Sequence, residues 1–289
     1  MSQEWSSDFS YGYLRRILQA LRSNFELHLL SEGLDLPRAG GRPGVILRHD
    51  IDVSLKRALR VAEIERECGV RATYMVMVNS ALYSLEDQAS REILQRLVGM
   101  GHEVTLHFNV DEEERNSACQ IGALETKIYA ARRYLEQVAG RPVRSISFHR
   151  PLVQFLHGPR LIAGMVNAYA GELMGWYLSD SKGRWREGEP LAKLLRPEED
   201  LLQLLIHPIW WGSEHMSPEE RLQEFFETET EGQARHTIEA FDANLAKAIP
   251  SVRRMGNLAR EEAWRPQGSP LHFRGSLRPD GPDISGGRV

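Results

Sequence analysis

Short apolar runs alternate with helical patterns along most of the chain, and this alternation restricts its fold more than any other feature. Runs with the length and composition of strands lie at 45–47, 72–78, 103–108, 143–148, 175–179 and 201–206. Between them apolar residues recur at helical spacing, for example from Ser54, a helix-capping residue, to Gly69. Strands that alternate with helices predict a parallel sheet covered by helices.

A parallel sheet of this kind is either an open, doubly wound sheet or a barrel. The first predicted strand is not followed by the Gly-rich motif that binds dinucleotides in doubly wound folds. We therefore favour an α/β fold with a closed or nearly closed barrel. Three parts are expected: an N-terminal helix and loop (1–44), the barrel (45–250), and a Gly-, Pro- and Arg-rich extension (251–289) that is largely disordered.

Composition excludes several classes of protein. With 36 Lys and Arg against 40 Asp and Glu, the formal net charge is -4, so no general positive field favours nucleic acid. The most apolar run, 201–211, is about half the length of a membrane span. Cys68 and Cys119 lack metal-site or disulfide-framework spacing, and no secretory signal is visible near residue 1, so we expect a cytoplasmic protein.

Acidic and imidazole side chains follow the predicted strands, and in barrels this is the rim that carries function. They are, in chain order, Asp50 and Asp52, His107 and Asp111, His149 beside Arg150, Asp180, and His207. Any one of them alone is better explained as a helix cap or a hydrogen-bonded core residue. Five such strand ends on one rim indicate a site, because buried carboxylates and imidazoles are costly unless they are paired or bind a metal.

The Asp-x-Asp step at Asp50 and Asp52 is the most informative pair, because alternate residues of a strand point to the same side. One carboxylate can bind a metal while the other handles a proton. Asp52 and His107 are the leading ligands of a divalent ion, for which we expect zinc. Asp50 would then serve as the base for an activated water and His207 as the acid, which together make an amide or ester hydrolase.

Five short blocks between residues 45 and 211 resemble, in order, the motifs of the polysaccharide deacetylases of the NodB-homology type (carbohydrate esterase family 4). They are VILRHDID, GHEVTLHFNVD, SISFHRP, YLSDSKGRW and LLIHPIWW. The resemblance implies a distorted, incomplete (β/α) barrel. It also implies roles for the residues that match the motifs: Asp50 as base, Asp52 and His107 as metal ligands, and Arg150 as the residue that orients the base. It further implies that Asp180 takes the place of the Asp in the fourth motif and that His207, in the fifth, is the catalytic acid.

The second block departs from the family pattern. Asp111 stands four residues after His107, where the family has a second histidine that binds the metal. The third ligand is therefore open between Asp111, which its position favours slightly, and His149. His102 is five residues from His107 and faces the other side of a regular strand.

Aromatic and basic residues beside the last two blocks suggest how a substrate is bound. Trp185, Trp210 and Trp211 suit the C–H faces of a sugar ring, although packing against the last helix explains the tryptophan pair equally well. Arg184, with Arg186, offers a contact for an anionic group or merely a soluble surface. We expect a hydrolase that removes an N-acetyl group from an amino sugar or glycan precursor. The alternatives are a hydrolase of a non-sugar linear amide and a non-catalytic glycan-binding relative.

Overall fold

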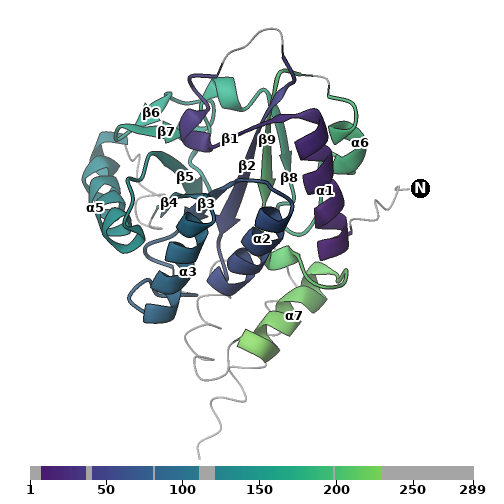
Figure 1. Ribbon diagram of the computed structural model, residues 1–289. Helices are drawn as coiled ribbons and strands as arrows, with labels where there is room; N and C mark the ends of the chain where they lie inside the picture. Colours follow the sequence, from purple (N-terminus) through teal and green to yellow (C-terminus); the bar gives the residue numbers. More distant parts are fainter. Residues whose placement is uncertain (1–7, 37–40, 81, 111–120, 198, 230–289) are drawn as a thin grey trace, which may run out of the picture.

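The computed structural model describes residues 8–36, 41–80, 82–110, 121–197 and 199–229. In these residues one curled sheet runs in the order β6-β7-β5-β4-β3-β2-β9-β8, and β1 also pairs with β2 (Figure 1). The strands are β1 (Glu26–His28), β2 (Gly44–Ile51), β3 (Thr73–Val76), β4 (Glu103–Asn109), β5 (Ser145–His149), β6 (Leu161–Ile162), β7 (Met165–Asn167), β8 (Trp176–Ser179) and β9 (Leu201–Ile206). The α-helices are α1 (Tyr11–Asn24), α2 (Leu55–Glu67), α3 (Gln88–Gly99), α5 (Ile121–Ala139), α6 (Pro190–Leu194) and α7 (Pro218–Glu229).

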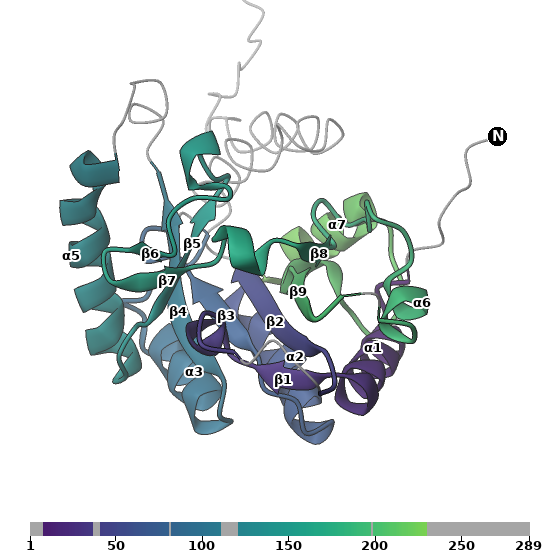
Figure 2. The same ribbon diagram turned by 90° about the horizontal axis from the view of Figure 1, so that it is seen from above.

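Every strand pair is parallel except β6 with β7, so the carboxyl ends of β2, β4, β5, β8 and β9 meet at one rim. The sheet curls round without closing, because β6 and β8 are its two ends and do not pair with each other among the described residues. Figure 2 shows this half-barrel from above, with the chain between β7 and β8 crossing from one side of the opening to the other. The predicted incomplete (β/α) barrel is confirmed.

Helices cover the outer face of the curled sheet, as α1, α2, α3 and α5 show in Figure 1. The predicted cap at Ser54 is confirmed: its hydroxyl accepts a hydrogen bond from the backbone N–H of Arg57, 3.2 Å away, and satisfies one free donor at the start of α2. Ala58, Val61 and Ala62 are fully buried and form the inner face of that helix. None of the described helices combines the length and hydrophobicity that crossing a lipid bilayer requires.

Alternation along β2 separates two buried polar layers. Arg48 and Asp50 point into the barrel, whereas His49, between them, points outward and contacts Glu65 of α2 with its Nε2 2.6 Å from Oε1. Tyr74 of β3 donates a hydrogen bond to the other carboxylate oxygen of Glu65 at 2.7 Å. The inward layer belongs to the rim, and the outward layer joins the sheet to α2.

Predicted and observed elements differ where long-range pairing decides. In the sequence, apolar residues recur at helical spacing from Tyr13 to Leu30, but α1 ends at Asn24 and 26–28 form β1, because this segment pairs in parallel with the start of β2. The sequence also predicts a long helix from Glu113 to Val138; α5 covers Ile121–Ala139, and residues 111–120 lie outside the described part of the chain. Residues 230–289 also lie outside the described part, so the extension over 251–289 stays a prediction.

Candidate active site

A cavity of about 560 Å³ opens among the carboxyl ends of the strands. The residues predicted for the site that line it are Asp50, Asp52, His107, His149, Arg150, Arg186, His207 and Trp210. Asp180 lies directly behind His207, and Asp111 lies outside the described residues. The cavity therefore collects residues from β2, β4, β5 and β9 together with the segments that follow them.

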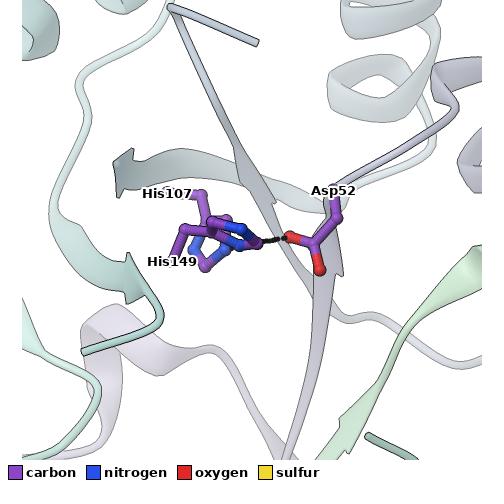
Figure 3. A group of neighbouring side chains, drawn as sticks. All are labelled: Asp52, His107 and His149. Carbon is purple, nitrogen blue, oxygen red and sulfur yellow. Dashed lines mark ion pairs between the residues drawn. The ribbon is translucent and has the colours of Figure 1, made fainter. Parts of the chain in front are cut away.

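Asp52, His107 and His149 form a cluster in which one potential ligand atom from each lies within 4.8 Å of the others (Figure 3). Oδ1 of Asp52 is 3.1 Å from Nε2 of His107 and 3.2 Å from Nδ1 of His149. Burial raises the pKa of Asp52, but the imidazoles of His149 and His107 outweigh it and hold that pKa well below its usual range. A carboxylate and two imidazoles are donors that suit zinc and similar divalent ions.

Two further observations show that this cluster fits a metal. Nδ1 of His107 is 2.6 Å from Oγ of Ser147 on the neighbouring strand, an arrangement that fixes the ring and leaves Nε2 facing Asp52. Oδ1 of Asp52 is buried and faces the two imidazole nitrogens at 3.1 and 3.2 Å, as expected for an oxygen that shares a cation with them. The structure thus assembles His149, the alternative third ligand, with Asp52 and His107.

Asp50 is held by an arginine two residues earlier on the same strand. Nε and Nη2 of Arg48 donate to Oδ1 and Oδ2 of Asp50 at 2.8 and 2.7 Å, and the Arg48 side chain is completely buried. Nη2 also donates to the hydroxyl of Tyr169 at 2.9 Å, and Nη1 to Oε1 of Gln203 at 3.2 Å. Burial raises the pKa of Asp50, but the charge of Arg48 outweighs it and lowers that pKa, so Asp50 is a carboxylate at neutral pH.

His207 and Asp180 form a second buried pair on the opposite side of the cavity. Nδ1 of His207 is 2.7 Å from Oδ1 of Asp180, and Nε1 of Trp211 donates to Oδ2 of Asp180 at 3.0 Å. Burial lowers the pKa of His207, but the hydrogen bond and charge of Asp180 outweigh it and raise that pKa to about 9. His207 therefore carries a proton at neutral pH, and its Nε2 lies 3.8 Å from Oδ2 of Asp52.

Three other residues predicted for the site, Trp185, Trp211 and Arg184, do not line the cavity. Trp185 and Trp211 pack against Phe9, at ring-centroid distances of 6.3 and 5.2 Å, and neither lines the cavity. Both rings thus pack against the start of the described chain, and Trp211 also donates to Asp180, whereas Trp210 lines the cavity. Arg184 is exposed and does not line the cavity.

Arg150 lines the cavity directly after β5, with a backbone φ of 50°, in the left-handed region. The hydrogen bonds to Asp50 described above come from Arg48, and the orienting role that the family resemblance implies for Arg150 stays a prediction.

Arg48, Ser147, Tyr169 and Gln203 support the site and were not predicted. A signal existed for Arg48, because it precedes Asp50 by two residues in a strand and so shares its face. No local signal existed for the other three, since their contacts join β4 to β5 and β2 to β9 and to the segment after β7.

Similarity to known proteins is found among solved structures. No family model matches the sequence, and no curated protein matches it either. Solved structures with a similar fold include the Streptococcus pyogenes deacetylase PplD (15% identity, 74% of this chain and 85% of that one, TM-score 0.39). Others are the Bacillus subtilis peptidoglycan deacetylase PdaC (13%, 77% and 97%, 0.38) and a CE4 family pseudoenzyme from Bacillus anthracis (15%, 68% and 67%, 0.38). At TM-scores below 0.4 these three similarities assign no activity to the present chain.

Proposed function

We propose that this protein is a metal-dependent hydrolase that removes an acyl group from the nitrogen of an amino sugar or glycan precursor. The observation that carries the proposal is the convergence of three groups in one cavity: the cluster Asp52, His107 and His149, the carboxylate Asp50, and the protonated His207. The motif resemblance of the sequence supports the same reaction.

The proposed ligands of the metal are Asp52, His107 and His149, with Asp111 the alternative to His149. A divalent ion bound there would lower the pKa of a water molecule and polarise the acyl carbonyl. The three ligands come from the ends of β2, β4 and β5, so the sheet itself positions them.

Asp50 is proposed to accept the proton of the attacking water. It is suited to this task because Arg48 keeps it ionised and fixes both of its oxygens, while its Oδ2 lies 3.8 Å from Nε2 of His107. Each carboxylate oxygen of Asp50 has a second lone pair besides the one that accepts from Arg48, and such a lone pair can accept the proton of the water.

His207 is proposed to donate its proton to the leaving nitrogen. Asp180 holds the ring through Nδ1, so Nε2 is the nitrogen that faces the cavity. Proton donation from Nε2 would leave a neutral imidazole whose Nδ1–H still bonds to Asp180. Trp210 lines the same part of the cavity and offers a flat face to a sugar ring.

The first test measures metal content and activity together. The purified full chain is reconstituted with zinc, dialysed, and analysed for zinc beside the variants Asp52→Ala, His107→Ala and His149→Ala. We expect about one ion per parent chain and at least a tenfold loss of affinity in each variant. His28→Ala is the matched control and is expected to retain the ion, because His28 lies in β1 beside the start of β2, far from the carboxyl end that carries the cluster.

A parallel Asp111→Ala variant identifies the third ligand. Retention of zinc in Asp111→Ala and its loss in His149→Ala assign the ligand to His149, and the reverse result assigns it to Asp111. Hydrolysis of N-acetylglucosamine oligomers is then measured with the zinc-loaded parent and with Asp50→Asn. A parent that binds zinc but releases no acyl group from any amino sugar would refute the proposed function and leave a glycan-binding or other amidase role.

A further inference from the structure

The cavity extends well beyond the groups that the proposed reaction needs. Besides the polar residues at the rim, it is lined by Leu156, Tyr169, Met174, Tyr177 and Leu205, which we name the seam chamber. Strand register places two of these residues relative to the rim. Leu205 is level with Arg48 and lies two residues below His207, and Tyr177 is level with Gln203, four residues below it. At about 3.3 Å per residue, the Cα atoms of Leu205 and Tyr177 lie roughly 7 and 13 Å along the strands from the level of His207.

The seam chamber lies where the barrel fails to close. Tyr177 belongs to the edge strand β8, and Tyr169 and Met174 belong to the segment that links β7 to β8 across the opening (Figure 2). Leu156 follows β5 on the opposite side and is 39% exposed at the cavity mouth. A closed barrel would fill this space with side chains, so the opening leaves an apolar space next to the reacting groups.

Several polar groups beside the chamber make hydrogen bonds within the protein, and the charged lining residues Lys182, Arg186 and Glu187 come after the carboxyl end of β8, on the rim side. The hydroxyl of Tyr169 donates to the carbonyl of Phe148 at 3.1 Å and accepts from Arg48 at 2.9 Å. Nε2 of Gln203 donates to two backbone carbonyls at 2.9 and 3.0 Å, and Oγ of Ser179 is 2.6 Å from Oγ of Ser181. A sugar ring in this space would bury hydroxyl groups without partners, which is unfavourable, whereas a hydrocarbon chain would not.

The direction of the substrate follows from the proposed acid. His207 is assigned to the leaving nitrogen, so the sugar lies on the side of the cavity that His207 lines, together with Trp210 three residues further along the chain. The acyl group lies on the other side of the carbonyl carbon, toward Leu205 and Tyr177. Resting on the proposed function, we infer that the seam chamber binds the acyl group and that this group is longer than acetyl, an alkyl or aryl acyl chain.

The test compares acyl chains of increasing length on one amino sugar. The zinc-loaded parent is assayed with methyl glycosides of N-acetyl-, N-butanoyl-, N-hexanoyl- and N-octanoylglucosamine. Each buried methylene is expected to raise kcat/KM about fourfold until the chamber is full, so butanoyl should exceed acetyl on the order of tenfold. Highest kcat/KM with acetyl and a fall with every added methylene would overturn the inference while the proposed function stands.

Variants at one residue change the chamber in opposite directions. Met174→Trp fills it and is expected to remove the preference for long chains. Met174→Ala enlarges it and is expected to move the optimum to a longer chain. Leu195→Trp, at a leucine that is 59% exposed after α6, is the matched control and should leave the chain-length profile unchanged.

Binding separates failure of the inference from failure of the proposed function. Calorimetric titration of the metal-free parent with the acetyl and octanoyl glycosides needs no turnover. Octanoyl binding at least tenfold tighter than acetyl, lost in Met174→Trp, supports the chamber even if no glycoside is hydrolysed. Equal binding of the two glycosides, or equal octanoyl binding by parent and Met174→Trp, refutes it.

Discussion

Replacing Arg48 by leucine tests the central electrostatic feature of the site. Arg48 and Asp50 make two charge-assisted hydrogen bonds at 2.8 and 2.7 Å, and their side chains are 0% and 5% exposed. Arg48→Leu removes the positive partner and leaves Asp50 buried without it. The variant also removes the donors to Tyr169 and Gln203.

The expected magnitude follows from burial. Loss of one partner of a buried ion pair destabilises proteins by about 3–5 kcal/mol, because the remaining charge stays desolvated. Hydrogen bonds to charged groups contribute about 1.5–3 kcal/mol each, so loss of two such bonds agrees with that range. Arg48→Leu and Asp50→Leu should each reduce the free energy of unfolding by this amount, and the double variant should lose far less than their sum.

The assay is urea unfolding of the parent, both single variants and the double variant, in the metal-free state at pH 7. We expect a coupling free energy of about 2 kcal/mol or more from this double-mutant cycle. A coupling below about 0.5 kcal/mol would refute the reasoning, since it would mean that the two residues do not stabilise each other.

Dependence of stability on pH gives the same test a second readout. Asp50 has a lowered pKa in the folded parent, so its contribution to stability is present above the unfolded value of about 4 and is lost as pH falls through the folded pKa. In Arg48→Leu the largest of the groups that lower the pKa of Asp50 is gone, so that pKa should rise. The stability difference between parent and variant should therefore shrink as pH falls from 7 toward 4.

Two further predictions concern the other buried polar groups. Asp180→Asn removes the charge and weakens the hydrogen bond that raise the pKa of His207 to about 9. His207 then loses its proton at lower pH, so the alkaline limb of the kcat/KM profile should move to lower pH by about 1 unit or more. An unchanged limb would exclude His207 as the acid. Glu65→Leu leaves His49 and Tyr74 without their shared acceptor and should reduce the free energy of unfolding by about 3 kcal/mol, measured in urea, with unchanged zinc content; a loss below about 1 kcal/mol would contradict this.

Sequence alone predicted most of the strands and which strand ends carry chemistry. The run 201–206 coincides with β9, and residues at or just after the carboxyl ends of β2, β4, β5 and β9 meet in one cavity as expected. This is possible because apolar periodicity reports local structure, and parallel strands necessarily bring their carboxyl ends to one rim. The short strand β1 escaped prediction because its three residues become a strand only by pairing with β2.

The cluster around Asp52 shows what spacing along one strand does not report. Counting four residues from His107 slightly favoured Asp111, which lies outside the described residues, while His149, the other candidate, lies in the cluster. Register explains this: His107 pairs with Ser147, and Asn109 pairs with His149, so β5 carries His149 to the same rim. Neighbouring strands lie about 4.8 Å apart, a distance that side chains bridge directly, and no count along one strand can report it.

Local geometry therefore determined from sequence what a strand or helix imposes on its own residues: the shared face of Asp50 and Asp52, and the cap at Ser54. Tertiary structure alone decided which residues become partners across elements. It placed Gln203 against Arg48, Ser147 against His107, and Trp211 rather than Trp210 behind Asp180. The physical reason is that these contacts depend on strand register and on the incomplete closure of the barrel, and both are set by the packing of the whole sheet and its helices.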